Sequence, residues 1–115
     1  MGYVGFYMDQ REAVRVPVHV KARCRCSGSG IVIDGLVEDV SRSGLFMRAP
    51  KWIRPGSSAE IELAVPGDEL LSLSVEVVRV EHSDGKAGMG LRFVSPTATS
   101  RSLANFIMRQ HASGR

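Results

Sequence analysis

Apolar and polar residues alternate along the first clear element of the chain. From Val14 to Cys26 every second residue is apolar, and the residues between them are mostly basic or polar. Successive side chains of a strand point to opposite faces, so this period of two predicts a half-buried strand over residues 14–26. Pro17 places the strand at a sheet edge or near its own start, because proline donates no hydrogen bond to a sheet.

The same alternation recurs five more times, separated by turn residues. Further strands are predicted over residues 31–41, 44–48, 59–65, 71–80 and 87–93. A bulge or bend is expected near Asp34 and Gly35, and another where the apolar phase slips from Val77 to Val78. Six strands joined by short turns predict an all-β fold, a small six-stranded antiparallel β-barrel.

One helix is predicted at the C-terminal end, after the last strand. Ser95 and Pro96 supply an N-cap and a first-turn proline. Leu103, Phe106 and Ile107 then recur at helical spacing, which predicts the face that docks on the barrel.

Composition limits the chain to one domain without a second, catalytic one, since 115 residues build a single core. The formal net charge is +3, and the basic excess gathers between Arg11 and Arg25. This balance favours a small anionic ligand over a long polyanion. No run approaches the roughly 18 apolar residues of a membrane helix, and the N-terminus lacks a signal-peptide pattern, so a cytoplasmic protein without membrane insertion is expected.

The two cysteines, Cys24 and Cys26, are too few for a disulfide framework. Both lie on the apolar face of the first predicted strand, and no second Cys/His pair stands at zinc-binding spacing. Buried free thiols and no metal site are therefore predicted.

Two polar clusters flank the first two predicted strands. Arg11 and Arg15 form the first, and their planar guanidinium groups suit phosphate oxygens or the O6/N7 edge of guanine. Asp39, Ser41 and Gly44 form the second. A carboxylate can accept the two N–H donors of guanine's Watson–Crick edge, a hydroxyl can bond beside it, and a glycine lets a base approach the backbone. Asp39 and Ser41 share strand parity, which favours one common ligand.

Neither cluster contains a nucleophile with an adjacent base, so recognition rather than catalysis is indicated. With both clusters in this order, the chain resembles the PilZ domain, a bacterial receptor for the second messenger cyclic di-GMP. An R-x-x-x-R element is formed by Arg11 and Arg15, and a D-x-S-x-x-G element by Asp39, Ser41 and Gly44.

The resemblance implies a PilZ-like domain over residues 10–111, preceded by an N-terminal segment of residues 1–9. It implies cyclic di-GMP as the ligand, no other cofactor, and relay of the signal to an unknown downstream protein by conformational change. The residues that it assigns to the ligand site are Gln10, Arg11, Arg15, Asp39, Ser41, Ser43 and Gly44.

Two departures from the family pattern concern the ligand. Many members carry an arginine where this chain has Gln10, which leaves open whether one ligand or a stacked pair binds. Some members place an aromatic residue late in the fifth strand to stack on a base. Near that place this chain offers Arg79, whose guanidinium plane can also stack.

Other interpretations remain at this point. The chain is alternatively a PilZ-like interaction module without nucleotide binding, or a small barrel for single-stranded nucleic acid. The latter is disfavoured because only seven residues are aromatic and several belong to the predicted core. Trp52 is either an exposed anchor or a plug of the barrel end, and the plug is favoured because tryptophan is usually largely buried. The apolar segment before Arg11 is either packed on the barrel or a second subunit, or a ligand-gated partner surface.

Overall fold

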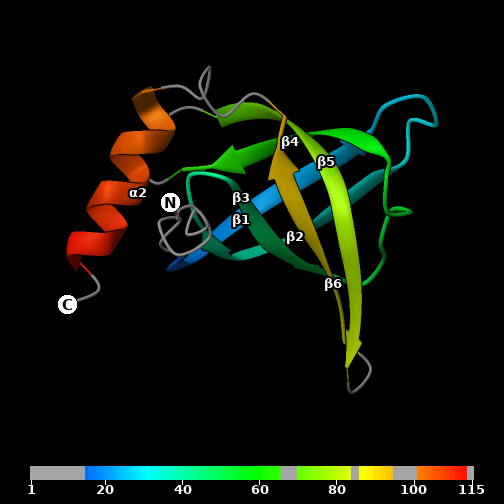
Figure 1. Ribbon diagram of the computed structural model, residues 1–115, viewed down its shortest axis with the longest axis horizontal. Helices are drawn as coiled ribbons and strands as arrows, with labels where there is room; N and C mark the ends of the chain where they lie inside the picture. Colours follow the sequence, from blue (N-terminus) through cyan, green and yellow to red (C-terminus); the bar gives the residue numbers. More distant parts are fainter. Residues whose placement is uncertain (1–14, 66–69, 84–85, 95–100, 114–115) are drawn as a thin grey trace, which may run out of the picture.

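The computed structural model describes residues 15–65, 70–83, 86–94 and 101–113 of the chain (Figure 1). They form six strands and one helix: β1 (Val16–Cys26), β2 (Val32–Val40), β3 (Gly44–Ala49), β4 (Ser58–Ala64), β5 (Leu70–Ser83), β6 (Lys86–Phe93) and α2 (Arg101–Ser113). Each strand lies where the sequence pattern predicts one, with ends that differ by a few residues.

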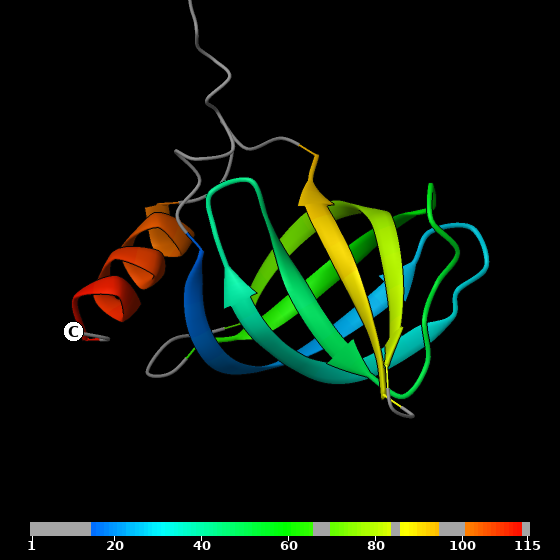
Figure 2. The ribbon, with the colours of Figure 1, turned by 60° about the horizontal axis from the view of Figure 1, so that its bottom comes forward.

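The strands close into a barrel in the order β1-β2-β3-β6-β5-β4, and every neighbouring pair is antiparallel (Figure 2). Closure gives each strand two partners, so the barrel has no free edge. The predicted fold, a six-stranded antiparallel β-barrel with one C-terminal helix, is confirmed.

Strict alternation decides which side chains fill the barrel. Along β1 buried and exposed residues alternate from Val16 to Cys26 without a break. Cys24 and Cys26 are free and buried, as predicted. Burial raises the pKa of the Cys24 thiol to about 11, so this thiol stays protonated at neutral pH.

The predicted bulge near Asp34 and Gly35 is wrong. These residues pair in unbroken register with Arg23 and Ala22 of β1. Gly35 is needed for packing instead, because a Cβ atom there would overlap the carbonyl oxygen of Arg48.

The irregularities of β1 and β2 lie instead near the start of β1 and the end of β2, which pair with each other. The register shifts between Pro17 and Val20 of β1, and between Val37 and Asp39 of β2. In β5 the predicted slip after Val77 is confirmed as a register shift before Arg79. Such shifts re-aim the side chains beside them, and Asp39 follows one directly.

Helix α2 lies outside the barrel and contacts β1 (Figure 2). Leu103 and Phe106 are buried and Ile107 is partly buried, which confirms the predicted docking face. The predicted N-cap at Ser95 and Pro96 falls outside the described residues. Within the described part of the chain, no helix has the length and apolar character needed to cross a membrane.

The loop between β3 and β4 corrects the interpretation of Trp52. This side chain is 47% exposed, whereas its neighbour Ile53 is buried. The smaller aliphatic side chain fills the interior at this end of the barrel, and the plug interpretation of Trp52 is therefore wrong.

Candidate functional site

Arg15 and Asp39, one from each predicted cluster, meet in an ion pair. Arg15 stands directly before β1, and Asp39 stands in β2 opposite Pro17. The Nε and Nη2 atoms of Arg15 donate to Oδ1 of Asp39 at 3.0 and 2.5 Å. Both bonds end on the same carboxylate oxygen, so this guanidinium does not engage Oδ2.

Both partners of this pair remain accessible to solvent. The side chains of Arg15 and Asp39 are 46% and 32% exposed. An exposed ion pair contributes about 0–1 kcal/mol to stability, so an incoming ligand can separate the two groups at small cost. Without a ligand, the pair holds the Arg15 guanidinium and the Asp39 carboxylate side by side.

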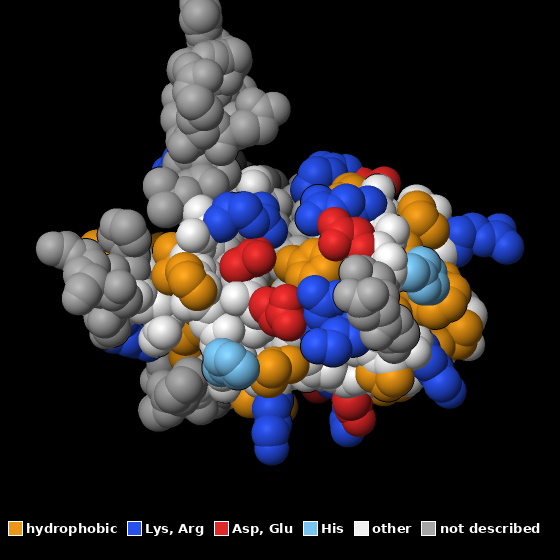
Figure 3. Space-filling view, turned by 90° about the horizontal axis from the view of Figure 1, so that it is seen from below, with side chains coloured by type: hydrophobic (Ala, Val, Ile, Leu, Met, Phe, Trp, Pro, Cys, Tyr) orange, Lys and Arg blue, Asp and Glu red, His pale blue; other side chains and the backbone are white. Residues whose placement is uncertain are grey.

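Acidic and basic side chains lie interleaved on the face of the molecule that Figure 3 shows. Among the described residues, further arginine–carboxylate pairs join Arg23 to Asp34, Arg48 to Glu38, Arg79 to Glu81 and Arg92 to Glu76. An arginine–carboxylate pair alone therefore does not mark a site. The Arg15–Asp39 pair is distinguished by the turn beside it.

That turn, between β2 and β3, is shaped by the hydroxyl of Ser41. Ser41 is fully buried, its Oγ accepts the Ser43 N–H at 3.2 Å, and it donates to the Gly44 carbonyl at 3.3 Å. The Ser43 hydroxyl lies 3.1 Å from that of Ser41. The expectation that Asp39 and Ser41 face one ligand by parity is wrong, because β2 ends at Val40 and alternation does not continue into the turn.

Gly44 is required by the neighbouring strand. A Cβ atom at this position would overlap the carbonyl oxygen of Leu91 in β6. The Phe93 N–H donates to the Ser43 carbonyl at 2.9 Å, which ties the same turn to β6. Close backbone packing against β6 is therefore sufficient to require a glycine at this position.

A transverse row of outward-facing residues extends from Asp39 across the barrel. Asp39 stands opposite Phe46 of β3, Phe46 opposite Gly90 of β6, and Gly90 opposite Arg79 of β5. Arg79 therefore lies on the same face as the Arg15–Asp39 pair, three strands away from Asp39.

Phe46 and Arg48 belong to this face, although the sequence analysis did not select them. The Phe46 ring lies over Gly88, where a Cβ atom would overlap it. The guanidinium carbons of Arg48 and Arg79 lie 4.9 and 5.7 Å from the ring centroid. The signal available in the sequence was an outward-facing phenylalanine in β3 combined with two outward-facing glycines, Gly88 and Gly90, in β6.

Two of the predicted site residues, Gln10 and Arg11, lie outside the described residues. Of the remaining five, Arg15, Asp39 and Ser43 lie at the surface, whereas Ser41 and Gly44 are buried in the turn. The exposed part of the candidate site therefore consists of the ion pair and the tip of the turn.

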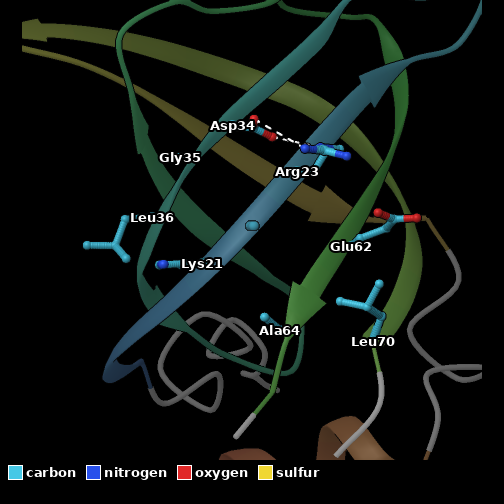
Figure 4. Close-up of a pocket in the computed structure, with 9 residues that line it drawn as sticks. Lys21, Arg23, Asp34, Gly35, Leu36, Glu62, Ala64 and Leu70 are labelled. Carbon is cyan, nitrogen blue, oxygen red and sulfur yellow. Dashed lines mark hydrogen bonds and ion pairs between the residues drawn. The ribbon is translucent and has the colours of Figure 1, made fainter.

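A shallow groove of about 590 Å³ lies further along the outer face of β1 (Figure 4). Lys21, Leu36 and Leu70 line it, and the Arg23–Asp34 ion pair lies at one end. This pair lowers the pKa of Asp34, mainly through the hydrogen bond from Arg23. The groove contains none of the predicted ligand residues.

The family of the chain follows from comparison with known domains. The PilZ domain family matches residues 9–109, which include both predicted clusters. The chain belongs to the PilZ domain family.

Solved structures share the fold at low sequence identity. The PilZ domain of YcgR from Escherichia coli with c-di-GMP superposes with a TM-score of 0.76 at 14% identity, covering 92% of this chain and 95% of that chain. The inhibitor of motility MotI/DgrA from Bacillus subtilis gives 0.68 at 18% identity over 91% of this chain and 53% of that chain. A tetrameric PilZ-domain protein from Xanthomonas campestris gives 0.60 at 24% identity over 70% and 46%. No curated protein matches the chain significantly.

The packing at Gly44 generates a prediction about stability. Gly44→Ala should lower the free energy of unfolding by about 1–3 kcal/mol, because the added methyl group forces β3 and β6 apart. The urea midpoint measures this, with the exposed Ser72→Ala of β5 as a control expected to change stability by less than about 0.5 kcal/mol. Unchanged stability of Gly44→Ala together with lost nucleotide binding would instead assign this glycine to ligand approach.

Proposed function

We propose that this protein is a receptor for cyclic di-GMP, and that it binds the ligand on the outer face of the barrel beside the β2–β3 turn. The observation that carries the proposal is the Arg15–Asp39 ion pair, with bonds of 3.0 and 2.5 Å. It places an anion-binding fork and a guanine-binding carboxylate side by side, which a guanine nucleotide needs together. Membership of the PilZ domain family and the c-di-GMP in the YcgR structure support the choice of ligand.

In the proposed complex Arg15 and Asp39 separate from each other, and each binds the nucleotide instead. The Asp39 carboxylate accepts the N1–H and N2–H donors of one guanine, and Arg15 turns to a phosphate oxygen or to the O6/N7 edge. One weak exposed ion pair is lost and several charge-assisted hydrogen bonds form. The buried hydroxyl of Ser41 acts by holding the turn, and the exposed Ser43 adds a polar contact.

The transverse row across the barrel offers a binding position for the second guanine base of cyclic di-GMP. Arg79 is 55% exposed on its side chain, and Glu81 holds its Nε at 2.9 Å. A guanidinium held in this way over Phe46 and Gly90 offers its outer face for stacking on a base. Gln10 and Arg11 complete the proposed site from the segment before β1.

The proposal includes binding and relay but no catalytic step. Because Arg15 directly precedes β1 and closely follows Arg11, gripping a phosphate there restrains the backbone just upstream. We assign the relay of the signal to this upstream segment and to an unknown downstream protein.

The nucleic-acid alternative lacks a stacking platform among the described residues. Single-strand platforms use several exposed aromatic side chains. Phe46, Phe93 and Phe106 are buried, which leaves Trp52 as the exposed aromatic residue in the described part of the chain. The alternative without nucleotide binding is decided by the titrations that follow.

Arg15 is the first target of mutation. Arg15→Ala should weaken cyclic di-GMP binding by roughly 10- to 100-fold, the effect of losing a hydrogen bond to a charged group. Arg15→Lys should recover little of this, because lysine keeps the charge but loses the planar fork. Calorimetry measures both, with Arg23→Lys as the matched control, since Arg23 of β1 forms a similar pair with Asp34 of β2. If Arg15→Lys binds with an affinity near that of the unmodified protein, Arg15 contributes only its positive charge and the planar fork is not needed.

Asp39 should set the selectivity for guanine. Adenine has no N1–H or N2 amine, so Asp39→Ala should lower the preference for cyclic di-GMP over cyclic di-AMP by about 1–3 kcal/mol. Asp34→Ala removes a similar exposed carboxylate from the same strand and should leave the preference unchanged. Equal binding of cyclic di-AMP by the unmodified protein would refute the assigned role.

The relay is tested in the segment before β1. Amide hydrogen exchange across residues 2–10 should change on addition of saturating cyclic di-GMP, and a variant lacking residues 1–8 should bind with altered affinity. A ligand shifts a conformational equilibrium only by its unequal affinity for the two states. Unchanged exchange combined with unchanged affinity would move the output to the barrel surface, to α2 or to the oligomeric state.

A further inference from the structure

A row of outward-facing side chains forms the floor of the groove beside β1. Lys21 stands opposite Leu36 of β2, and Ala64 of β4 stands opposite Leu70 of β5. The register between β1 and β4 puts Lys21 next to Ala64. All four residues line the groove of about 590 Å³, and Figure 4 shows them in one line from Leu36 to Leu70. The row therefore crosses four neighbouring strands of the barrel.

Three of the four residues in this row are apolar and accessible. Leu70 is 59% exposed, Ala64 is exposed and Leu36 is half-buried. Apolar side chains that lie together at a surface mark an interaction site, unlike single scattered ones. The groove therefore suits an occupant with apolar side chains.

The charged residues of the groove are mostly compensated within it. The Nε atom of Arg23 donates to Oδ1 of Asp34 at 2.8 Å, and Glu62 stands opposite Arg23 on its other side. Lys21 has no ion-pair partner among the described residues. An occupant that fits these charges is uncharged apart from one carboxylate for Lys21.

The chain itself carries a segment of this composition before β1. Residues 3–8 are uncharged, and all but Gly5 have an apolar or aromatic side chain. Asp9 follows them directly. The barrel is closed, so this segment cannot join it as a further strand. Its contacts with the barrel must come from side chains on the outer face.

The link between this segment and β1 is long enough to reach the groove. Arg15 directly precedes β1, and Lys21 follows six residues later, about 20 Å at 3.3 Å per residue. Asp9 precedes Arg15 by the same six residues, so an extended link brings its carboxylate to Lys21. At about 4.8 Å between strands, the row from Leu36 to Leu70 is about 14 Å wide, which about four extended residues cross.

The neighbouring groove beyond β2 fits this segment less well. It measures about 480 Å³ and shares Leu36, but Glu38, Arg48 and Lys86 also line it. Three charged side chains disfavour an occupant without charges. The link from Arg15 would also have to cross β2 to reach this groove.

We propose that, in the protein without nucleotide, residues 3–8 of the same chain dock in the groove beside β1. The aromatic side chains of the segment pack against Ala64 and Leu70. The Asp9 carboxylate pairs with the ammonium group of Lys21.

This docking and nucleotide binding exclude each other. The extended link holds Arg11 about 13 Å from Arg15, at 3.3 Å per residue. The proposed nucleotide site needs both arginines on one ligand, so cyclic di-GMP must release the segment from the groove. The docking itself does not need nucleotide, whereas its release rests on the function proposed above.

The docking is tested by NMR on the full chain without nucleotide. In a labelled sample, nuclear Overhauser effects should connect the rings of Phe6 and Tyr7 to the methyl groups of Ala64 and Leu70. In an equal mixture of labelled and unlabelled chains, an isotope-filtered experiment that detects only contacts between chains should show none of them. The proposal is overturned if these effects are absent, which leaves the groove to another partner. It is also overturned if they arise between chains, which makes a second copy the occupant.

The release is tested by calorimetry with cyclic di-GMP. Removal of residues 1–8 should tighten binding by roughly 3- to 10-fold, because a docked population of about 70–90% weakens the apparent affinity by that factor. Leu70→Asp should have the same effect in the full chain and none in the truncated chain. Ile31→Asp changes a similarly exposed residue outside the groove and should leave the affinity of both chains unchanged. Circular dichroism confirms that each variant is folded.

Unchanged or weaker binding by the truncated chain would contradict the release. If the unmodified chain does not bind cyclic di-GMP at all, the proposed function fails instead. The nuclear Overhauser effects still decide the docking in that case, since they are recorded without nucleotide.

Discussion

Closure of the six strands into one barrel is the constraint on which the other features depend. Each strand pairs on both sides, so the register of all six is fixed relative to one another. Inward side chains must fill one common core, and outward side chains are left free for other contacts. Asp39, Phe46, Gly90 and Arg79 form one row because of how three successive strand pairs are registered, with one shift directly before Asp39 and another directly before Arg79. The proposed ligand surface is a consequence of that closure.

The glycines of β6 shape this surface as much as its larger residues do. Gly88 leaves the space in which the Phe46 ring lies, and Gly90 leaves the space beside the Arg79 side chain. Phe46 in turn lies beneath two guanidinium groups, those of Arg48 and Arg79. A larger residue at Gly88 would displace the ring and, with it, the support of both arginines. The two glycines therefore determine how closely the Phe46 ring and the guanidinium groups of Arg48 and Arg79 pack on the outer face of the barrel.

The sequence sufficed for features that depend on neighbours along the chain, and failed for features that depend on other strands. Alternation predicted the six strands, the buried cysteines and the slip after Val77. It did not show that Gly35 and Gly44 avoid overlap with Arg48 and Leu91, because those contacts join distant segments. Strand parity also placed Ser41 on the same face as Asp39, which fails because β2 ends at Val40 and Ser41 is buried in the turn. Arg15 and Asp39 were selected from residue chemistry and family resemblance, but their ion pair required the register of β1 and β2.

The proposed nucleotide site lies at the Gly44 end of β3, and the β3–β4 loop lies at the other end, so this strand is the direct path between them. Gly44 and Ala49 bound the strand, so at about 3.3 Å per residue the two ends are roughly 16 Å apart. Coupling over such a distance needs an element with two discrete arrangements. The strand between them offers none, because its inward residues Leu45 and Met47 are fully packed in the core and both its neighbours hold its register. We therefore place the proposed relay at Arg15, directly before β1, rather than along β3.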